Sequence, residues 1–292
     1  MRRILLGLRE LDGTEKTADS WSSDMQIEIR LCHGWSTVAK SDSRLKVEFF
    51  GPESDIDKSH EDQVVGYINV GYINDTHIVA LNIYPVFRPQ YMLLSINSKR
   101  SQNDAMKLED ISAAWQFIHI TSTPMYAMYN CTPTAGCSRY HKHIQVLPEP
   151  RRQDSNDSEF VFFPERTPDK VRVPYTYFLH QFDSVSPDSR LHDSEVFEVY
   201  MMLLSECRKA LGIAELDTTT PCPHNAILVH NAILVKGWML LIPRRSNNVQ
   251  GLMVNSAGML GMPAVLTEEM VQKWRDAGPA RVLAQFGIPQ DT

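Results

Sequence analysis

The stretch from Asn130 to Pro148 constrains this chain most, because a loop of small residues runs there into a strictly alternating segment. Every second position of the segment 141–145 carries a polar ring or amide, namely His141, His143 and Gln145. Side chains two positions apart on a β-strand share a face. The pattern therefore predicts a strand that presents two imidazoles and one amide together.

The loop before this segment contains residues that favour turns, among them Pro133, Gly136 and Ser138. Glycine allows backbone conformations that other residues avoid, and successive backbone N–H groups in a turn can face an anion. A loop that can hold phosphate, followed by a strand with nucleophilic imidazoles, predicts a site for phosphate chemistry.

Two other interpretations of the histidines stay open on the residues alone. His141 and His143 could be chance surface residues on an alternating strand, since short motifs match by accident. They could also share a zinc ion, because Cys131 and Cys137 are near in sequence. The usual ligand spacings of zinc sites, such as a C-x-x-C pair, do not occur beside them.

The run from His141 to Gln145 resembles the His-x-His-x-Gln signature of the nucleotidyltransferase branch of the histidine-triad (HIT) superfamily. With the preceding loop it is similar to the fungal ATP adenylyltransferases, also called diadenosine tetraphosphate (Ap4A) phosphorylases. The chain keeps the loop residues Asn130, Cys131, Pro133, Gly136, Ser138, His141, Lys142, His143 and Gln145. It departs at Thr132, where that loop has glycine, and at Ala135, Cys137, Arg139 and Tyr140.

Weaker matches extend the resemblance over about residues 25–148 and 174–289. The segment from His77 to Val86 is similar to a family strand in which Asn82 is a polar residue of the nucleotide site, although the lysine that follows it there is Ile83 here. A lysine is expected after the early strand at 25–31, and Lys40 is the nearest candidate.

The resemblance implies roles for these residues. His143 would attack the α-phosphorus of a dinucleoside polyphosphate and carry AMP as a phosphoramidate, while His141 would orient it or hold a neighbouring phosphate. Gly136 and Ser138 would stabilise phosphate oxygens. The further residues implied for nucleotide or phosphate binding are Asn82, Asn130 and Lys40.

Gln145 distinguishes the transferase from hydrolytic relatives, which have a third histidine at this position. An amide cannot exchange protons at neutral pH, so the adenylyl group would wait for an anionic acceptor. Formation of the adenylyl group from Ap4A would release ATP, and attack by phosphate on that group would give ADP. Two alternatives stay open: a hydrolase of similar substrates, and a catalytically weakened nucleotide-binding protein, which the departures at Ile83, Ala135 and Arg139 allow.

Composition sets outer limits on this function. The 292 residues carry a net charge of −6, which argues against a general nucleic-acid binder. Five cysteines without paired spacing, and no apolar run long enough for a membrane, predict a protein of the cytoplasm or the nucleus. The expected partners are a dinucleoside polyphosphate, ATP or ADP, and phosphate. No tightly bound cofactor and no metal ligands are expected, with Mg²⁺ arriving on the nucleotide.

The expected fold is α+β: a HIT-like antiparallel sheet with flanking helices, and a C-terminal ATP-adenylyltransferase-type module packed on it. The predicted division is a lead-in at 1–24, loose or helical, a catalytic core at 25–150, an exposed connector at 151–173 and a C-terminal module at 174–292. Alternation predicts strands at 25–31, 67–70, 77–83, 91–96 and 126–129. Apolar period and caps predict helices at 104–119 and 194–211, and a closing helix after Thr267 that breaks near Pro279.

A perfect duplication interrupts the C-terminal part, where the six residues 224–229 are repeated as 230–235. The second copy fits a hairpin made of Asn231–Val235, a Lys236-Gly237 turn and Trp238–Ile242. The first copy is then expected to bulge out or to lengthen the preceding strand, and to be dispensable.

Overall fold

The computed structural model describes residues 2–6, 25–32, 67–82, 85, 88–150, 160–166, 172–182, 191–231 and 236–290. Lys40 and Ile83, named above, lie outside these residues. The described elements are, in chain order, β1 (Arg2–Leu6), β2 (Ile27–Leu31), β3 (Tyr67–Ile73), β4 (His77–Asn82), β5 (Tyr91–Ser95), α3 (Leu108–Ile120), β6 (Met125–Cys131), the 3-10 turn η2 (Pro133–Ala135), β7 (His143–Pro148), the 3-10 turn η3 (Phe163–Glu165), β8 (Phe178–Phe182), α4 (Asp193–Ala210), β9 (His224–Asn231), β10 (Lys236–Pro243), α5 (Ser256–Met259), β11 (Ala264–Val265), α6 (Glu268–Ala277) and α7 (Pro279–Phe286).

Eight of these strands form one sheet in the order β3-β4-β5-β7-β6-β9-β10-β8, and each neighbouring pair is antiparallel. Strands from the predicted C-terminal module thus continue the sheet of the predicted core, edge to edge. A second, smaller sheet has the order β1-β2-β11. The α+β fold expected from the sequence is confirmed, whereas the boundaries of the predicted modules stay a prediction.

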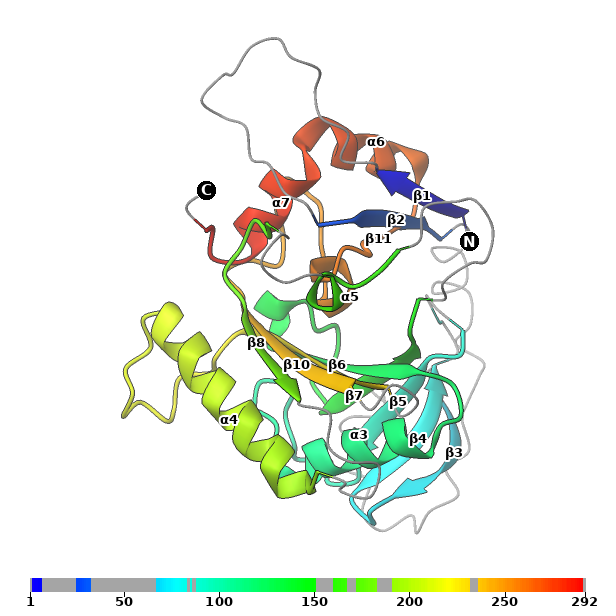
Figure 1. Ribbon diagram of the computed structural model, residues 1–292, viewed down its shortest axis with the longest axis vertical. Coiled ribbons are helices and arrows are strands. Elements are labelled where there is room, and N and C mark those ends of the chain that lie inside the picture. The colour runs from blue at the N-terminus through cyan, green and yellow to red at the C-terminus, as the bar shows by residue number, and fades with distance from the viewer. Residues whose placement is uncertain are drawn as a thin grey trace.

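The large sheet is sandwiched between two layers (Figure 1). Helices α3 and α4 cover one face, and α5, α6 and α7 lie with the small sheet on the other side. Successive side chains of the central strands point alternately to the two faces of the sheet. Ala127 and Met239 pack on the α3 and α4 side, whereas Met128 and Leu240 pack on the opposite side. A sheet that is covered on both faces explains why the central strands are apolar at nearly every position.

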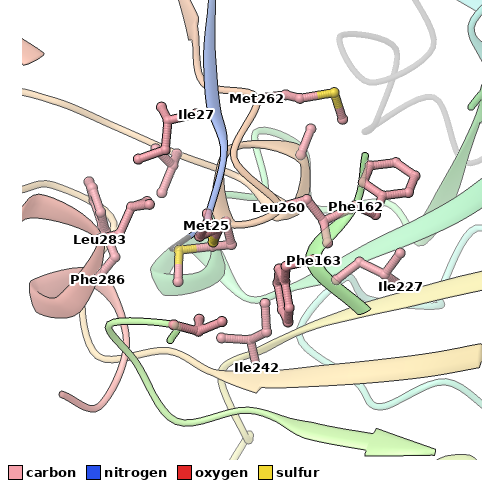
Figure 2. Packing of buried hydrophobic residues seen from close by; sticks show 14 of the residues in the cluster. Met25, Ile27, Phe162, Phe163, Ile227, Ile242, Leu260, Met262, Leu283 and Phe286 are labelled. Carbon is pink, nitrogen blue, oxygen red and sulfur yellow. The ribbon is translucent and has the colours of Figure 1, made fainter. Parts of the chain in front are cut away.

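The core on the α7 side brings together residues that are far apart in the sequence (Figure 2). Side chains of β2, β9, β10 and α7 meet there, and Figure 2 shows Phe162 and Phe163 among them. These phenylalanines lie within residues 151–173, which the composition predicts to be an exposed connector. That prediction is wrong for Phe160, Phe162, Phe163, Pro164 and Val173. Phe160, Phe162, Phe163 and Val173 are buried. Burying four large side chains outweighs the polar composition around them.

Local patterns located most described elements but missed the first strand. Arg2–Leu6, expected to be loose or helical, is a strand that pairs antiparallel with β2. Its partner lies more than twenty residues away, so its own pattern does not reveal the pairing. The predicted break between the last two helices is confirmed, because α6 ends at Ala277 and α7 begins at Pro279. Thr267 caps α6 as expected, with its hydroxyl oxygen 3.2 Å from the Met270 nitrogen.

The duplicated segment has the opposite arrangement to the one expected. The first copy, His224–Val229, is a central strand of the sheet: β9 pairs with β6 on one side and β10 on the other. The pairing Val229↔Trp238 continues through His230↔Gly237 to Asn231↔Lys236. The first copy therefore does not bulge out, and His230 and Asn231 of the second copy extend its pairing with β10.

Deleting six residues here should nevertheless be tolerated, for a different reason. The two copies are identical, so removing either one gives the same polypeptide, in which the surviving copy can form β9. Val229 and Trp238 would then be joined by Lys236 and Gly237 alone, a two-residue hairpin loop. An even deletion keeps the alternation of faces. We expect a free energy of unfolding within about 1 kcal/mol of wild type, measured by urea melts.

A one-residue deletion of Leu228 provides the control for this prediction. It reverses the faces of the β9 residues that precede it, so it should unfold the chain at much lower urea concentrations. A melt of the six-residue deletion that resembles this control would mean that both copies of the segment are needed for folding.

Candidate active site

The candidate site forms where two central strands separate. β6 and β7 pair from Met125↔Pro148 to Met128↔Gln145, and the ladder then ends. The chain between them turns through η2 and Gly136, which has φ of +88°. A Cβ atom on Gly136 would lie 2.5 Å from the Val254 carbonyl oxygen, so only glycine fits without a shift. The loop is therefore held closely against the segment that leads into α5.

His143 is the first residue of β7 and is 3% exposed. Its Nδ1 lies 2.8 Å from the His141 carbonyl oxygen. A carbonyl only accepts hydrogen bonds, so Nδ1 carries the proton and Nε2 keeps its lone pair. Burial lowers the pKa of His143 to about 4. The ring is therefore neutral at physiological pH, with one nucleophilic nitrogen of fixed identity.

His141 and Gln145 lie on either side of His143 along the chain. His141 Nε2 donates to the Ser95 carbonyl oxygen at 2.7 Å. Gln145 Oε1 accepts a hydrogen bond of 2.7 Å from Gln90 Nε2. β7 begins at His143, however, and His141 forms only an isolated bridge with Ser101. The predicted strand with all three side chains on one face is thus wrong at His141, which precedes the strand.

The residues expected to bind nucleotide or phosphate are divided among several places. Asn82 ends β4, and its N–H donates to the carbonyl oxygen of Gln90, the residue that contacts Gln145. Gly136 is half-buried and Ser138 is exposed, both in the loop before β7. Lys40 lies outside the described residues. Their roles in binding stay predictions.

Asn130 lies in a buried polar network under the loop. Its Oδ1 accepts hydrogen bonds from Asn225 Nδ2, at 2.9 Å, and from both the backbone N–H and the hydroxyl of Ser256, at 2.8 and 2.7 Å. The carboxamide oxygen of Asn130 is thus occupied by protein donors. Asn225 belongs to the first copy of the duplicated segment, so it is this copy that contributes to the network.

Arg244 is the most heavily bonded member of this network and is 1% exposed. Its NH1 donates to the Ala135 carbonyl oxygen at 3.2 Å and to Asn225 Oδ1 at 2.6 Å. Its other nitrogens donate to the carbonyl oxygens of Phe286, Ser246 and Val254. Burial lowers the pKa of this guanidinium, and no carboxylate of the described residues forms an ion pair with it. A positive charge is therefore held directly beneath the loop.

Lys142, between the two histidines, points to the other side of the sheet. Its Nζ donates to the Ala105 carbonyl oxygen at 2.6 Å and lies 3.1 Å from Asp110 Oδ2. Burial would raise the pKa of Asp110, but the hydrogen bond from His77 and the charges of Lys142 and Arg100 lower it to about 2. Lys142 thus fastens the start of β7 to α3. Within the described ranges, no three His, Cys, Asp or Glu side chains are placed to hold a metal ion.

Thr132 is strained, and replacing it with glycine should stabilise the protein. Its φ and ψ are +73° and 158°, a region populated almost only by glycine, and its buried hydroxyl has no hydrogen-bond partner. Such a conformation costs about 1–3 kcal/mol, more than the roughly 0.5–1 kcal/mol of entropy that glycine adds to the unfolded chain. We expect Thr132→Gly to raise the free energy of unfolding by about 1–2 kcal/mol in denaturant melts.

Thr134, two residues further in η2, is the matched control. Thr134→Gly removes a side chain of the same kind where no strain is relieved, so it should lower stability. Equal effects of the two substitutions would contradict the strain at Thr132.

The sheet, its two helical layers and the buried histidine at the loop–strand junction define an α+β protein of the HIT-like class. Two family models match this chain: the N-terminal domain of Ap4A phosphorylase over residues 65–159, and the C-terminal domain of ATP adenylyltransferase over residues 171–289. The chain belongs to the Ap4A phosphorylase/ATP adenylyltransferase family.

Individual relatives are distant. The chain is 26% identical over 212 residues to diadenosine 5',5'''-P1,P4-tetraphosphate phosphorylase 2 of Saccharomyces cerevisiae, a match that covers 66% of this chain and 63% of that protein. It therefore matches less than two thirds of the relative's length. The fold is similar to that of yeast Ap4A phosphorylase Apa2. The crystal structure of Apa2 in complex with Ap4A gives a TM-score of 0.63 at 18% identity, over 92% of this chain and 87% of that chain. The complex of Apa2 with AMP gives a TM-score of 0.62 at 20% identity, over 77% of this chain and 79% of that chain.

Proposed function

We propose that this protein cleaves Ap4A with inorganic phosphate to give ADP and ATP, through an adenylyl group carried on His143. The observation that carries the proposal is the buried, neutral His143 ring, whose Nδ1 proton is committed to the His141 carbonyl oxygen. Among the described residues, none forms a hydrogen bond with its Nε2. Family membership and the ligands of the Apa2 structures, AMP and Ap4A, support the choice of substrate.

In the first step His143 Nε2 attacks the α-phosphorus, and the bond to the departing ATP oxygen breaks. The ring becomes positively charged as the P–N bond forms, and the hydrogen bond from Nδ1 to His141 stabilises that charge. The half-buried loop around Gly136, with the Arg244 charge beneath it, provides a positive environment for the phosphates. In the second step a phosphate oxygen attacks the same phosphorus, ADP is released and the ring becomes neutral again.

Gln145 favours phosphate over water as the acceptor. Its carboxamide cannot remove a proton from water, and its oxygen is engaged by Gln90. Phosphate is already anionic and needs no such base. We expect Mg²⁺ to arrive with the polyphosphate and not through ligands of this chain. The cytoplasm or nucleus remains the expected location, and no described helix is both long and apolar enough to cross a membrane.

An incubation with Ap4A, with and without phosphate, tests this function against both alternatives. Formation of ADP and ATP that requires phosphate supports the proposal. AMP and ATP formed without phosphate would identify a hydrolase. Tight binding of Ap4A in calorimetry, without turnover in either condition, would identify a nucleotide-binding relative that has lost activity.

A further inference from the structure

A side-chain amide occupies the place where the β6–β7 ladder opens. The register of the two strands would put Asn130 opposite His143 if the ladder continued beyond Met128↔Gln145. Gln102 lies between them instead. Its Nε2 donates to the carbonyl oxygens of Asn130 and of His143, both at 3.1 Å, and its Oε1 accepts from the His143 backbone N–H at 2.7 Å.

The backbone of Gln102 holds the loop itself. Its N–H donates to the Tyr140 carbonyl oxygen at 2.6 Å, and its carbonyl oxygen accepts from the Thr132 N–H at 3.1 Å. The hydroxyl of Tyr129 donates to the same carbonyl at 3.1 Å. One residue, 1% exposed, thus joins the beginning and the end of the loop that leads to His143.

We propose that Gln102 is a positioning residue for the transfer reaction: its amide replaces the missing strand pairing and fixes the His143 backbone so that Nδ1 stays bonded to His141 and Nε2 faces the substrate. This inference rests on the function proposed above. Gln102 itself touches neither the reacting nitrogen nor, in this role, the phosphates. A shift of about 1 Å in a reacting group can reduce a rate by roughly 100-fold.

The role requires an amide, because the site presents two carbonyl oxygens and one N–H to the same side chain. Glutamate keeps the shape and the acceptor but has no donor when ionised. Its carboxylate would be buried against the Asn130 and His143 carbonyl oxygens, which raises its pKa. Protonation would return one donor. Leucine has a similar volume and neither donor nor acceptor.

The test compares Gln102→Leu and Gln102→Glu with wild type in Ap4A phosphorolysis. We expect Gln102→Leu to lower kcat about 100-fold, with a much smaller change in KM. The activity of Gln102→Glu relative to wild type should rise as the pH falls from 8 to 6, as the carboxyl takes up its proton. Loss of packing alone would produce no such pH dependence.

Gln116→Leu is the control, because Gln116 forms a hydrogen bond with Asp193 between α3 and α4. This variant should keep wild-type kcat.

Imidazole ¹⁵N NMR of His143 separates this inference from the proposed function, since it needs no turnover. Wild type should show the Nδ1-protonated tautomer alone, and Gln102→Leu a mixture of the two tautomers. If wild type does not cleave Ap4A, the NMR result still decides whether Gln102 positions the ring. An unchanged tautomer in Gln102→Leu would overturn the inference, as would a flat pH profile for Gln102→Glu. If Gln102→Leu does not fold, the activity of Gln102→Glu relative to wild type at pH 6 and pH 8 decides whether the amide positions His143.

Discussion

Replacing His143 with alanine is expected to abolish Ap4A phosphorolysis, by at least about 1,000-fold, because the proposed route forms its covalent intermediate on the His143 ring nitrogen Nε2. The fold should survive. The variant loses a buried ring and the donor to the His141 carbonyl, which costs about 1–3 kcal/mol. Incubation with substrate labelled in the α-phosphate should mark wild type covalently and leave His143→Ala unlabelled.

His224 offers an unusually close control for this variant. It is also fully buried, its Nδ1 also lies 2.8 Å from the carbonyl oxygen two residues earlier, that of Cys222, and burial likewise lowers its pKa to about 4. Its Nε2, however, is occupied by the Tyr200 hydroxyl at 3.1 Å. His224→Ala should lose stability and keep the covalent label. Label retained on His143→Ala would show that another residue carries the adenylyl group.

The largest loss of stability is expected for Arg244→Met. Methionine fills a similar volume but offers no donors, so the four carbonyl oxygens and Asn225 Oδ1 would each lose a donor. The Ala135 and Phe286 carbonyl oxygens keep another donor, whereas the buried Asn225 Oδ1 and Val254 carbonyl oxygen have none other among the described residues. Each unsatisfied buried group costs about 1–3 kcal/mol. Even with partial relaxation we expect a fall of more than about 3 kcal/mol in the free energy of unfolding, measured in urea.

The neighbouring Arg245→Met is the matched control, because the Arg245 side chain is exposed. It should change stability by less than about 0.5 kcal/mol. Arg244→Lys should fall between the two, since an ammonium keeps the charge but cannot reach the same acceptors. If Arg244→Met and Arg245→Met melt alike, water or another donor must replace the guanidinium without cost.

The sequence located the centre of the candidate site but not its supports. Alternation and a family signature singled out His143 and Gln145, which do lie on one strand beside the loop. Gln102 had no signal, because a glutamine before a helix resembles any polar residue. Asn225 was hidden by the duplication: two identical copies give identical local patterns, and only pairing with β6 and β10 shows which copy is inside.

The sequence by itself determined the α+β class, most described strands and helices, the break at Pro279 and the family. These properties depend on side-chain periodicity, caps and short motifs, which neighbouring residues express together. The tertiary structure alone decided that Phe160, Phe162 and Phe163 are core residues and that Arg2–Leu6 is a strand. It also decided that β7 begins at His143, and that Gln102 and Arg244 fasten the loop. Each of these depends on a partner distant in the chain, and a local pattern contains no information about which partner a hydrogen bond or an apolar surface will meet.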